Sequence, residues 1–138
     1  MRLLLPAMVA ALTAAPALAD VTPFETPSGN IQCSVGTGEG PPGIECMISE
    51  LSGAPTTPRP AGCNGVWGHR FAMGERGVVT LQCGSPLPRD RAPAGNIAQY
   101  GKVGQFGGIV CQSSEAGLEC RNADGHGFFL SRRRQSVF

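Results

Sequence analysis

The chain has 138 residues and a formal net charge of +1, with 20 glycines, 12 prolines and six cysteines. A charge so close to zero argues against general nucleic-acid binding, which requires many uncompensated phosphate contacts. The glycine and proline content would interrupt most helices, and residues 20–138 have no clear helical periodicity. We therefore expect a small β-rich domain.

The first 19 residues have the pattern of a secretory signal peptide. Arg2 gives a positive start, an apolar run follows, and Ala17-Leu18-Ala19 is a small-x-small cleavage signal. We expect cleavage before Asp20, a single domain over residues 20–138, and a periplasmic or secreted product. A membrane anchor is the alternative, but two prolines interrupt the run and no later stretch could span a bilayer.

After a leading segment anchored by Phe24 and a turn at residues 26–30, the sequence predicts a β-hairpin over residues 31–48. An aliphatic residue precedes each cysteine by two positions, so the two share one face of an extended strand. The loop at residues 36–43 joins two strands whose inward faces carry Ile31, Cys33 and Val35 and, opposite them, Ile44, Cys46 and Ile48.

The middle of the chain predicts a looser hairpin between two irregular connections. Residues 52–65 are rich in proline, glycine, serine and threonine, and a second proline-rich connection follows at 84–95. Between them, residues 66–71 and 78–83 are predicted to be extended and joined by a turn at Arg76-Gly77.

The aliphatic-cysteine spacing recurs at residues 109–120 and predicts a second hairpin. Cysteines that face each other across a hairpin lie at a separation that suits a disulfide. Zinc is the alternative, but the chain has no C-x-x-C and an exported protein favours oxidation. We therefore expect three disulfides, namely Cys33–Cys46, Cys63–Cys83 and Cys111–Cys120.

Shorter elements surround the second hairpin. Residues 97–100 predict a short strand, residues 104–108 a bend around Phe106, and residues 121–132 a turn followed by one last strand. Short strands, frequent turns and cysteine pairs predict an all-β fold. We expect a small disulfide-stapled barrel or sandwich of short antiparallel strands, and favour the barrel.

Three segments and a single tryptophan carry a family resemblance. The segments are Phe24-x-Thr26-Pro27-Ser28-Gly29-Asn30-Ile31-x-Cys33, Tyr100-Gly101 and Gly125-His126-Gly127-Phe128-x-Leu130-Ser131-Arg132. In these the chain resembles a family of small exported, cysteine-rich bacterial proteins known as a domain of unknown function. The resemblance implies a secreted, cysteine-stapled single domain and gives no activity, cofactor or catalytic residue.

Asp124-Gly125-His126-Gly127 is the most suggestive group for catalysis. A histidine beside an acid could act as a general base, and Ser131 follows nearby. The alternative, which we favour, is a hairpin turn at Asp-Gly with His126 starting the strand that buries Phe128 or Phe129. A single strand could not fold back to bring Ser131 to the histidine.

Trp67, Arg132 and Arg134 are the candidates for binding. Trp67 could stack on a sugar, although a single tryptophan is more often part of a core. Arg132 and Arg134 would share one face of a strand and could meet an anionic partner. A charged edge strand facing solvent is the structural explanation for them, and we favour it.

We expect no metal site, because His69 and His126 lack ligand spacing, and no cofactor. The favoured function is a non-enzymatic binding or interaction module of the envelope or exterior. We expect a monomer with a protein or glycan ligand, held by loops 36–43, 52–62 and 84–95 on a rigid frame. The alternatives are a small inhibitor of a secreted hydrolase, a hydrolase using His126 and Asp124, and a purely structural envelope component.

Overall fold

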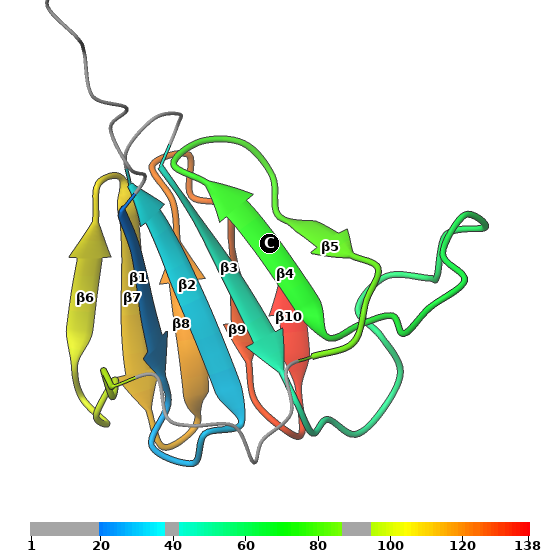
Figure 1. The fold of residues 1–138 in the computed structure, drawn as a ribbon, viewed down its shortest axis with the longest axis horizontal. Helices are drawn as coiled ribbons and strands as arrows, with labels where there is room; N and C mark the ends of the chain where they lie inside the picture. Colours follow the sequence, from blue (N-terminus) through cyan, green and yellow to red (C-terminus); the bar gives the residue numbers. More distant parts are fainter. Residues whose placement is uncertain (1–19, 38–41, 87–94) are drawn as a thin grey trace, which may run out of the picture.

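The computed structural model describes residues 20–37, 42–86 and 95–138, which form two five-stranded antiparallel sheets. Sheet 1 contains β1 (Asp20–Glu25), β2 (Ile31–Thr37), β3 (Gly43–Ile48), β4 (Arg70–Gly74) and β5 (Thr80–Gln82). Sheet 2 contains β6 (Val103–Phe106), β7 (Ile109–Ser114), β8 (Gly117–Arg121), β9 (Gly127–Leu130) and β10 (Gln135–Val137). In each sheet every strand pairs with the next one along the chain (Figure 1).

The two predicted cysteine hairpins are confirmed. Cys33 lies directly opposite Cys46 in the β2–β3 pair, and Cys111 lies opposite Cys120 in the β7–β8 pair. Side chains alternate between buried and exposed or half-buried along β3 and β7, as expected for strands with one face in a core. All three predicted disulfides are present, and the described residues include no free cysteine.

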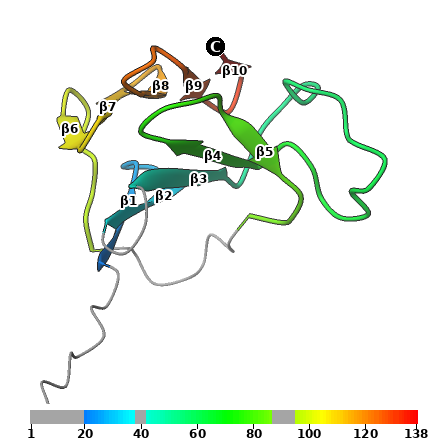
Figure 2. The same cartoon turned by 90° about the horizontal axis from the view of Figure 1, so that it is seen from above.

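The two sheets form a sandwich, and the favoured barrel is wrong. Figure 2 shows the sheets as two layers, and among the described residues no strand ladder joins the edge strands of one sheet to those of the other. The buried aliphatic, aromatic and cysteine side chains of both hairpins fill the space between the layers. Because each sheet buries one face in this shared core, the two layers stabilise each other.

Several short elements differ from the prediction. The leading segment is strand β1, with Phe24 buried as expected, and the predicted bend around Phe106 is strand β6. Residues 97–100 form no strand, and Ile97 makes a single parallel bridge to Glu25. These are edge elements with few inward apolar residues, so their hydrophobic pattern is weak.

The strands of the middle hairpin are shorter than predicted. The first begins at Arg70, because Gly68 adopts a φ of +96° that ends the extended backbone before it. The second spans Thr80–Gln82, and Cys83 is exposed and does not share the buried face of Val79. The irregular connection at residues 52–65 is confirmed.

The C-terminal segment contains two strands where one was expected. Residues 131–134 form the turn between β9 and β10, so Arg132 and Arg134 do not lie on a strand. Ser131 closes this turn: its backbone N–H donates to the Arg134 carbonyl at 2.8 Å, and its hydroxyl accepts from the Arg134 N–H at 3.0 Å.

The antiparallel connectivity gives the sandwich two distinct ends (Figure 1). The turns at residues 26–30, 115–116 and 131–134 lie at one end, which we call the turn end. The turns at residues 75–79 and 122–126 lie at the opposite end. In the part of the chain that is described, no helix has the length and apolar character needed to cross a membrane.

Candidate functional site

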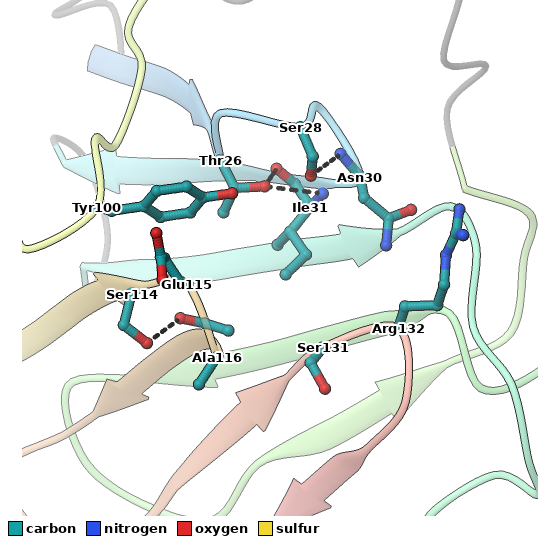
Figure 3. A pocket seen from close by; sticks show the side chains of 11 residues that line it. Thr26, Ser28, Asn30, Ile31, Tyr100, Ser114, Glu115, Ala116, Ser131 and Arg132 are labelled. Carbon is teal, nitrogen blue, oxygen red and sulfur yellow. Dashed lines mark hydrogen bonds between the residues drawn. The ribbon is translucent and has the colours of Figure 1, made fainter.

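A pocket of about 320 Å³ opens at the turn end of the sandwich (Figure 3). We call it the turn-end pocket. Its lining comes from residues 26–31, residues 114–117, residues 131–132 and Tyr100. The pocket therefore joins both sheets and the segment at residues 95–102, which we call the crossover because it leads from sheet 1 into sheet 2.

The first wall is the turn between β1 and β2. Gly29 has a φ of +71°, a conformation that glycine adopts without strain, and its N–H donates to the Thr26 carbonyl at 2.8 Å. The Thr26 hydroxyl accepts from the Ile31 N–H at 3.3 Å, and the Ser28 hydroxyl accepts from the Asn30 N–H at 3.2 Å. These local hydrogen bonds fix the conformation of the turn, and its side chains line the pocket.

The second wall ties the two sheets together. The Asn30 side chain donates to the Glu50 carbonyl at 2.9 Å and accepts from the Glu50 N–H at 2.7 Å. The Glu50 carboxylate pairs with the Arg132 guanidinium, and the Arg132 carbonyl accepts from the Ser52 N–H at 2.8 Å. Arg132 is thus held in the pocket wall beside Asn30 (Figure 3).

Ser113 of β7 positions the crossover that carries Tyr100. The buried Ser113 hydroxyl donates to the Ala98 carbonyl at 2.8 Å, and its backbone carbonyl accepts from the Gly101 N–H at 2.8 Å. Its backbone N–H donates to the Lys102 carbonyl at 3.0 Å. Three hydrogen bonds to one strand residue therefore place Tyr100 at the pocket with half of its surface exposed.

The pocket offers a mixed set of polar groups beside one aromatic ring. Tyr100 and Glu115 lie on one side and Arg132 lies on the other (Figure 3). Hydroxyls of Ser114 and Ser131 complete the set, although each already donates to a carbonyl of its own turn. Such a site can pack a ring against Tyr100 and exchange hydrogen bonds around it.

The structure places Asp124 and His126 at the opposite end of the sandwich. One Asp124 oxygen accepts from Arg76 at 2.8 Å and the other accepts from the Gly77 N–H at 2.7 Å. The Gly77 hydrogen bond, followed by the Arg76 guanidinium, lowers the pKa of Asp124 below its ordinary value. No hydrogen bond joins Asp124 to His126 among the described residues.

His126 and Ser131 are separated by the whole of β9, which is roughly 13 Å long at the usual rise per residue. The His126 Nδ1 faces the Phe138 carbonyl at 3.3 Å, and the Ser131 hydroxyl is used in its own turn. The structure therefore does not bring Ser131 to His126 and Asp124, as a hydrolytic site would require.

The other predicted binding residues also lie apart. Trp67 is half-buried in the connection between β3 and β4, outside the core between the sheets, and its indole N–H donates to the Thr57 carbonyl at 2.9 Å. Arg134 stacks over the Phe129 ring at 4.5 Å on the outer face of sheet 2. Of the three predicted binding residues, Arg132 alone lines the turn-end pocket.

No group of three or more histidine, cysteine, aspartate or glutamate side chains that could hold a metal ion occurs within the described ranges. The two histidines contact different segments: the His69 Nδ1 faces the Ile48 carbonyl at 2.6 Å, whereas His126 lies in the turn before β9 and its Nδ1 faces the Phe138 carbonyl.

A family model for a family of unknown function, DUF6636, matches residues 3–138. The chain belongs to this family. The resemblance noted in the sequence is therefore confirmed at the level of a family without a known function. No curated protein and no solved structure matches the chain.

The three segments that carry the resemblance all reach the turn-end pocket of this DUF6636 protein. Thr26, Ser28, Asn30 and Ile31 come from the first segment, Tyr100 from the second, and Ser131 and Arg132 from the third. Sequence reasoning missed Glu115 and did not single out Tyr100 or Asn30 as binding residues. The three segments that carry the family resemblance could have indicated the site. They lie far apart in the sequence, and a shared pocket is one reason for such segments to occur together.

Proposed function

We propose that this protein is an exported, monomeric, non-enzymatic binding module whose ligand, a short glycan, occupies the turn-end pocket. One observation carries the proposal: the half-exposed Tyr100 ring and the Glu115 carboxylate line one pocket with Arg132. An aromatic ring packs against the C–H face of a sugar, and charged groups bond its hydroxyls.

The number of carboxylates in the turn-end pocket favours binding over hydrolysis. Most glycosidases use two carboxyl groups on either side of the bond that is cleaved. Glu115 is the one carboxylate among the described lining residues, and the nearby Glu50 carboxylate pairs with Arg132. This arrangement supports a module that holds a sugar without cleaving it.

Export is supported by the cysteines. Three disulfides join six cysteines in the described residues, and such a set persists in oxidising compartments. The proposed signal peptide at residues 1–19 and its cleavage before Asp20 lie outside the described residues. N-terminal sequencing of the protein from periplasm and culture medium would test both the cleavage and the location.

A glycan-array screen followed by calorimetry on the selected sugar tests the proposed ligand. We expect Tyr100→Ala to weaken binding at least tenfold, because an aromatic anchor in a pocket carries much of the affinity. Tyr100→Phe keeps the ring and should lose only a few-fold. A selected sugar whose affinity is unchanged by Tyr100→Ala would refute the pocket as its site.

Glu115 offers a matched pair of variants. Glu115→Gln should weaken binding several-fold, whereas Glu119→Gln, on the exposed face of β8, should leave it unchanged. If the screened sugar is instead turned over, and His126→Ala abolishes the turnover, the hydrolase alternative is correct and the binding proposal fails.

A second candidate, an inhibitor of a secreted protease, is favoured by the connection at residues 52–62. Its apex, residues 57–62, is exposed and carries Arg59 between two prolines. Trp67 donates to the Thr57 carbonyl, and the Cys63 N–H donates to the Pro60 carbonyl at 3.0 Å. A loop fixed at these points beside the Cys63–Cys83 disulfide is preorganised for a partner.

Arg59 supplies the test of this second function. If the loop enters the cleft of a protease that prefers arginine, Arg59→Ala should abolish inhibition, and Arg59→Lys should retain part of it. Arg133→Ala, an exposed arginine at the turn end, is the matched control and should have no effect. Absence of inhibition across trypsin-like proteases would exclude this candidate.

A further inference from the structure

A second cavity, of about 350 Å³, opens along one edge of the sandwich between β1 and β6. We call it the edge cavity. Its lining comes from β1, the crossover, β6 and the adjacent strands β7 and β8. Its described lining shares no residue with that of the turn-end pocket.

The walls of the edge cavity are mostly apolar, although Thr22, Asn96 and Ser113 also line it. Phe24 of β1 and Phe106 of β6 stack with ring centroids 5.7 Å apart and planes 8° from parallel, so they bridge the two edge strands. The inner part reaches the buried Leu118 and Cys111 in the core of the sandwich. An alkyl chain placed here would contact carbon and sulfur on several sides.

The rim of the edge cavity is apolar at two exposed positions. Val103 is 61% exposed and Ile97 is 39% exposed, and both line the cavity. Exposed aliphatic side chains around an apolar cavity are typical of a ligand-binding surface. They extend the apolar wall from the core out to solvent.

Lys102 supplies the charge of the edge cavity. It is the one charged residue in the lining, it is exposed, and it makes no ion pair with any residue in the described ranges. The Asn96 side chain is already engaged, because its Nδ2 donates to the Pro23 carbonyl at 2.9 Å. An anionic group at the rim would therefore meet an ammonium group that no other described residue neutralises.

We propose that the edge cavity binds a single-chain amphiphile with an anionic head, namely a medium-chain fatty acid. The alkyl chain packs against the stacked Phe24 and Phe106 rings and against Leu118, and the carboxylate lies beside Lys102. This inference is independent of the glycan proposal, since the two sites have separate linings.

Calorimetric titration of the disulfide-bonded protein, produced as the full chain with export, tests this site. We use decanoate as the amphiphile, decanol as its uncharged counterpart and acetate as the head group alone, all below the aggregation concentration of decanoate. Decanoate should bind most tightly, and acetate should not bind. Each methylene removed from the chain should weaken binding about fourfold, from about 0.8 kcal/mol per buried methylene.

Two pairs of exposed variants locate the site without touching the core. Val103→Ser should weaken decanoate binding several-fold, whereas Val78→Ser, which is similarly exposed at the opposite end, should not. Lys102→Met should reduce the preference for decanoate over decanol by about threefold, as expected for an exposed ion pair, whereas Arg133→Met should not.

Ala98→Phe fills the edge cavity from the crossover and should abolish binding. A thermal melt of this variant shows whether it is folded. If it is not folded, the comparison of Val103→Ser with Val78→Ser decides whether decanoate binds in the edge cavity. Lack of saturable decanoate binding, or binding that Val103→Ser and Lys102→Met leave unchanged, would overturn the proposal. A loss of sugar binding in Tyr100→Ala would leave it standing.

Discussion

Phe71 and Phe128 meet between the two sheets, with ring centroids 5.9 Å apart and planes inclined at 43°. Phe71 of β4 lies directly opposite Cys46, and Phe128 of β9 lies directly opposite Cys120. Each ring therefore occupies the same position relative to the second cysteine of its own hairpin. The sandwich is built from two similar five-stranded sheets that meet through equivalent residues.

The first prediction concerns this aromatic pair. Both rings are fully buried, so Phe71→Ala and Phe128→Ala should each lower the free energy of unfolding by about 3–5 kcal/mol through lost burial and a cavity. Because the rings are in contact, the double variant should depart from the sum by at least about 0.5 kcal/mol. Urea unfolding of the oxidised proteins measures both effects.

Phe129 provides the control for that prediction. It neighbours Phe128 in β9 but is only half-buried, on the outer face beneath Arg134. Phe129→Ala should therefore cost clearly less than Phe128→Ala. Equal costs for the two variants would mean that the contact between the sheets is not the main source of stability.

The cysteine hairpins could be predicted because their signal is local. An aliphatic residue and a cysteine at positions i and i+2 must share a strand face, and a short loop then brings the strands together. Strands β6 and β10 could not be predicted with equal ease. They are short edge strands with no fully buried side chain, so packing against the neighbouring strand decides their conformation.

The second prediction concerns the order in which the disulfides are reduced. Cys83 is exposed, whereas the cysteines of both hairpin disulfides are buried between the sheets. A mild thiol should therefore reduce Cys63–Cys83 first, since the attacking thiolate must reach a sulfur atom. Partial reduction, alkylation and peptide mapping would identify the first pair opened.

Trp67 gives an optical check on the same prediction, because it is the single tryptophan of the chain. Trp67 lies within the loop that Cys63–Cys83 closes, and its indole N–H bonds the Thr57 carbonyl just before that loop, so its fluorescence should change with the first reduction step. Cys63→Ser/Cys83→Ser should lose about 3 kcal/mol and keep both sheets. Reduction of either hairpin disulfide before Cys63–Cys83 would contradict the expected order.

The third prediction concerns Asn122, a buried polar residue two positions after Cys120. Its side-chain amide donates to the Gly74 carbonyl at 3.2 Å and the Gly77 carbonyl at 2.7 Å. Its side-chain oxygen accepts from the N–H groups of Asp124 and His126, both at 3.1 Å. It therefore joins the β4–β5 turn of sheet 1 to the β8–β9 turn of sheet 2.

Asn122→Ala should destabilise the fold by about 3 kcal/mol, because it leaves several buried backbone groups without partners. Asn122→Leu should not restore stability, although Ile48 is apolar at the corresponding position of the first hairpin. Gln112→Ala, at an exposed position of β7, is the control and should change little. Urea unfolding compares the three, and a stable Asn122→Leu variant would contradict this role.

The candidate site was harder to predict than the hairpins, because it depends on how the sheets are stacked. Tyr100, Asn30 and Arg132 are neighbours only after the crossover has carried the chain from one sheet to the other. Buried Ser113 fixes that crossover through its three hydrogen bonds, at a position that is Val35 in the first hairpin. The sequence shows a hydroxyl residue where the first hairpin has an aliphatic one. It does not show that the hydroxyl donates to the Ala98 carbonyl of the crossover.

The fourth prediction concerns pH and Asp124. Its pKa lies below the ordinary value of 3.8 in the folded protein, mainly because the Gly77 N–H donates to it and secondly because of Arg76. A carboxyl group with a lowered pKa stabilises the fold above its unfolded pKa and loses this effect as the pH falls through the folded pKa. Wild type should therefore be more stable than Asp124→Asn at neutral pH, and the difference should shrink from about pH 4 downward. Thermal melts between neutral and acidic pH measure it. Arg76→Met should retain most of the effect, since the backbone hydrogen bond remains, and complete loss in that variant would show that Arg76 is the main cause.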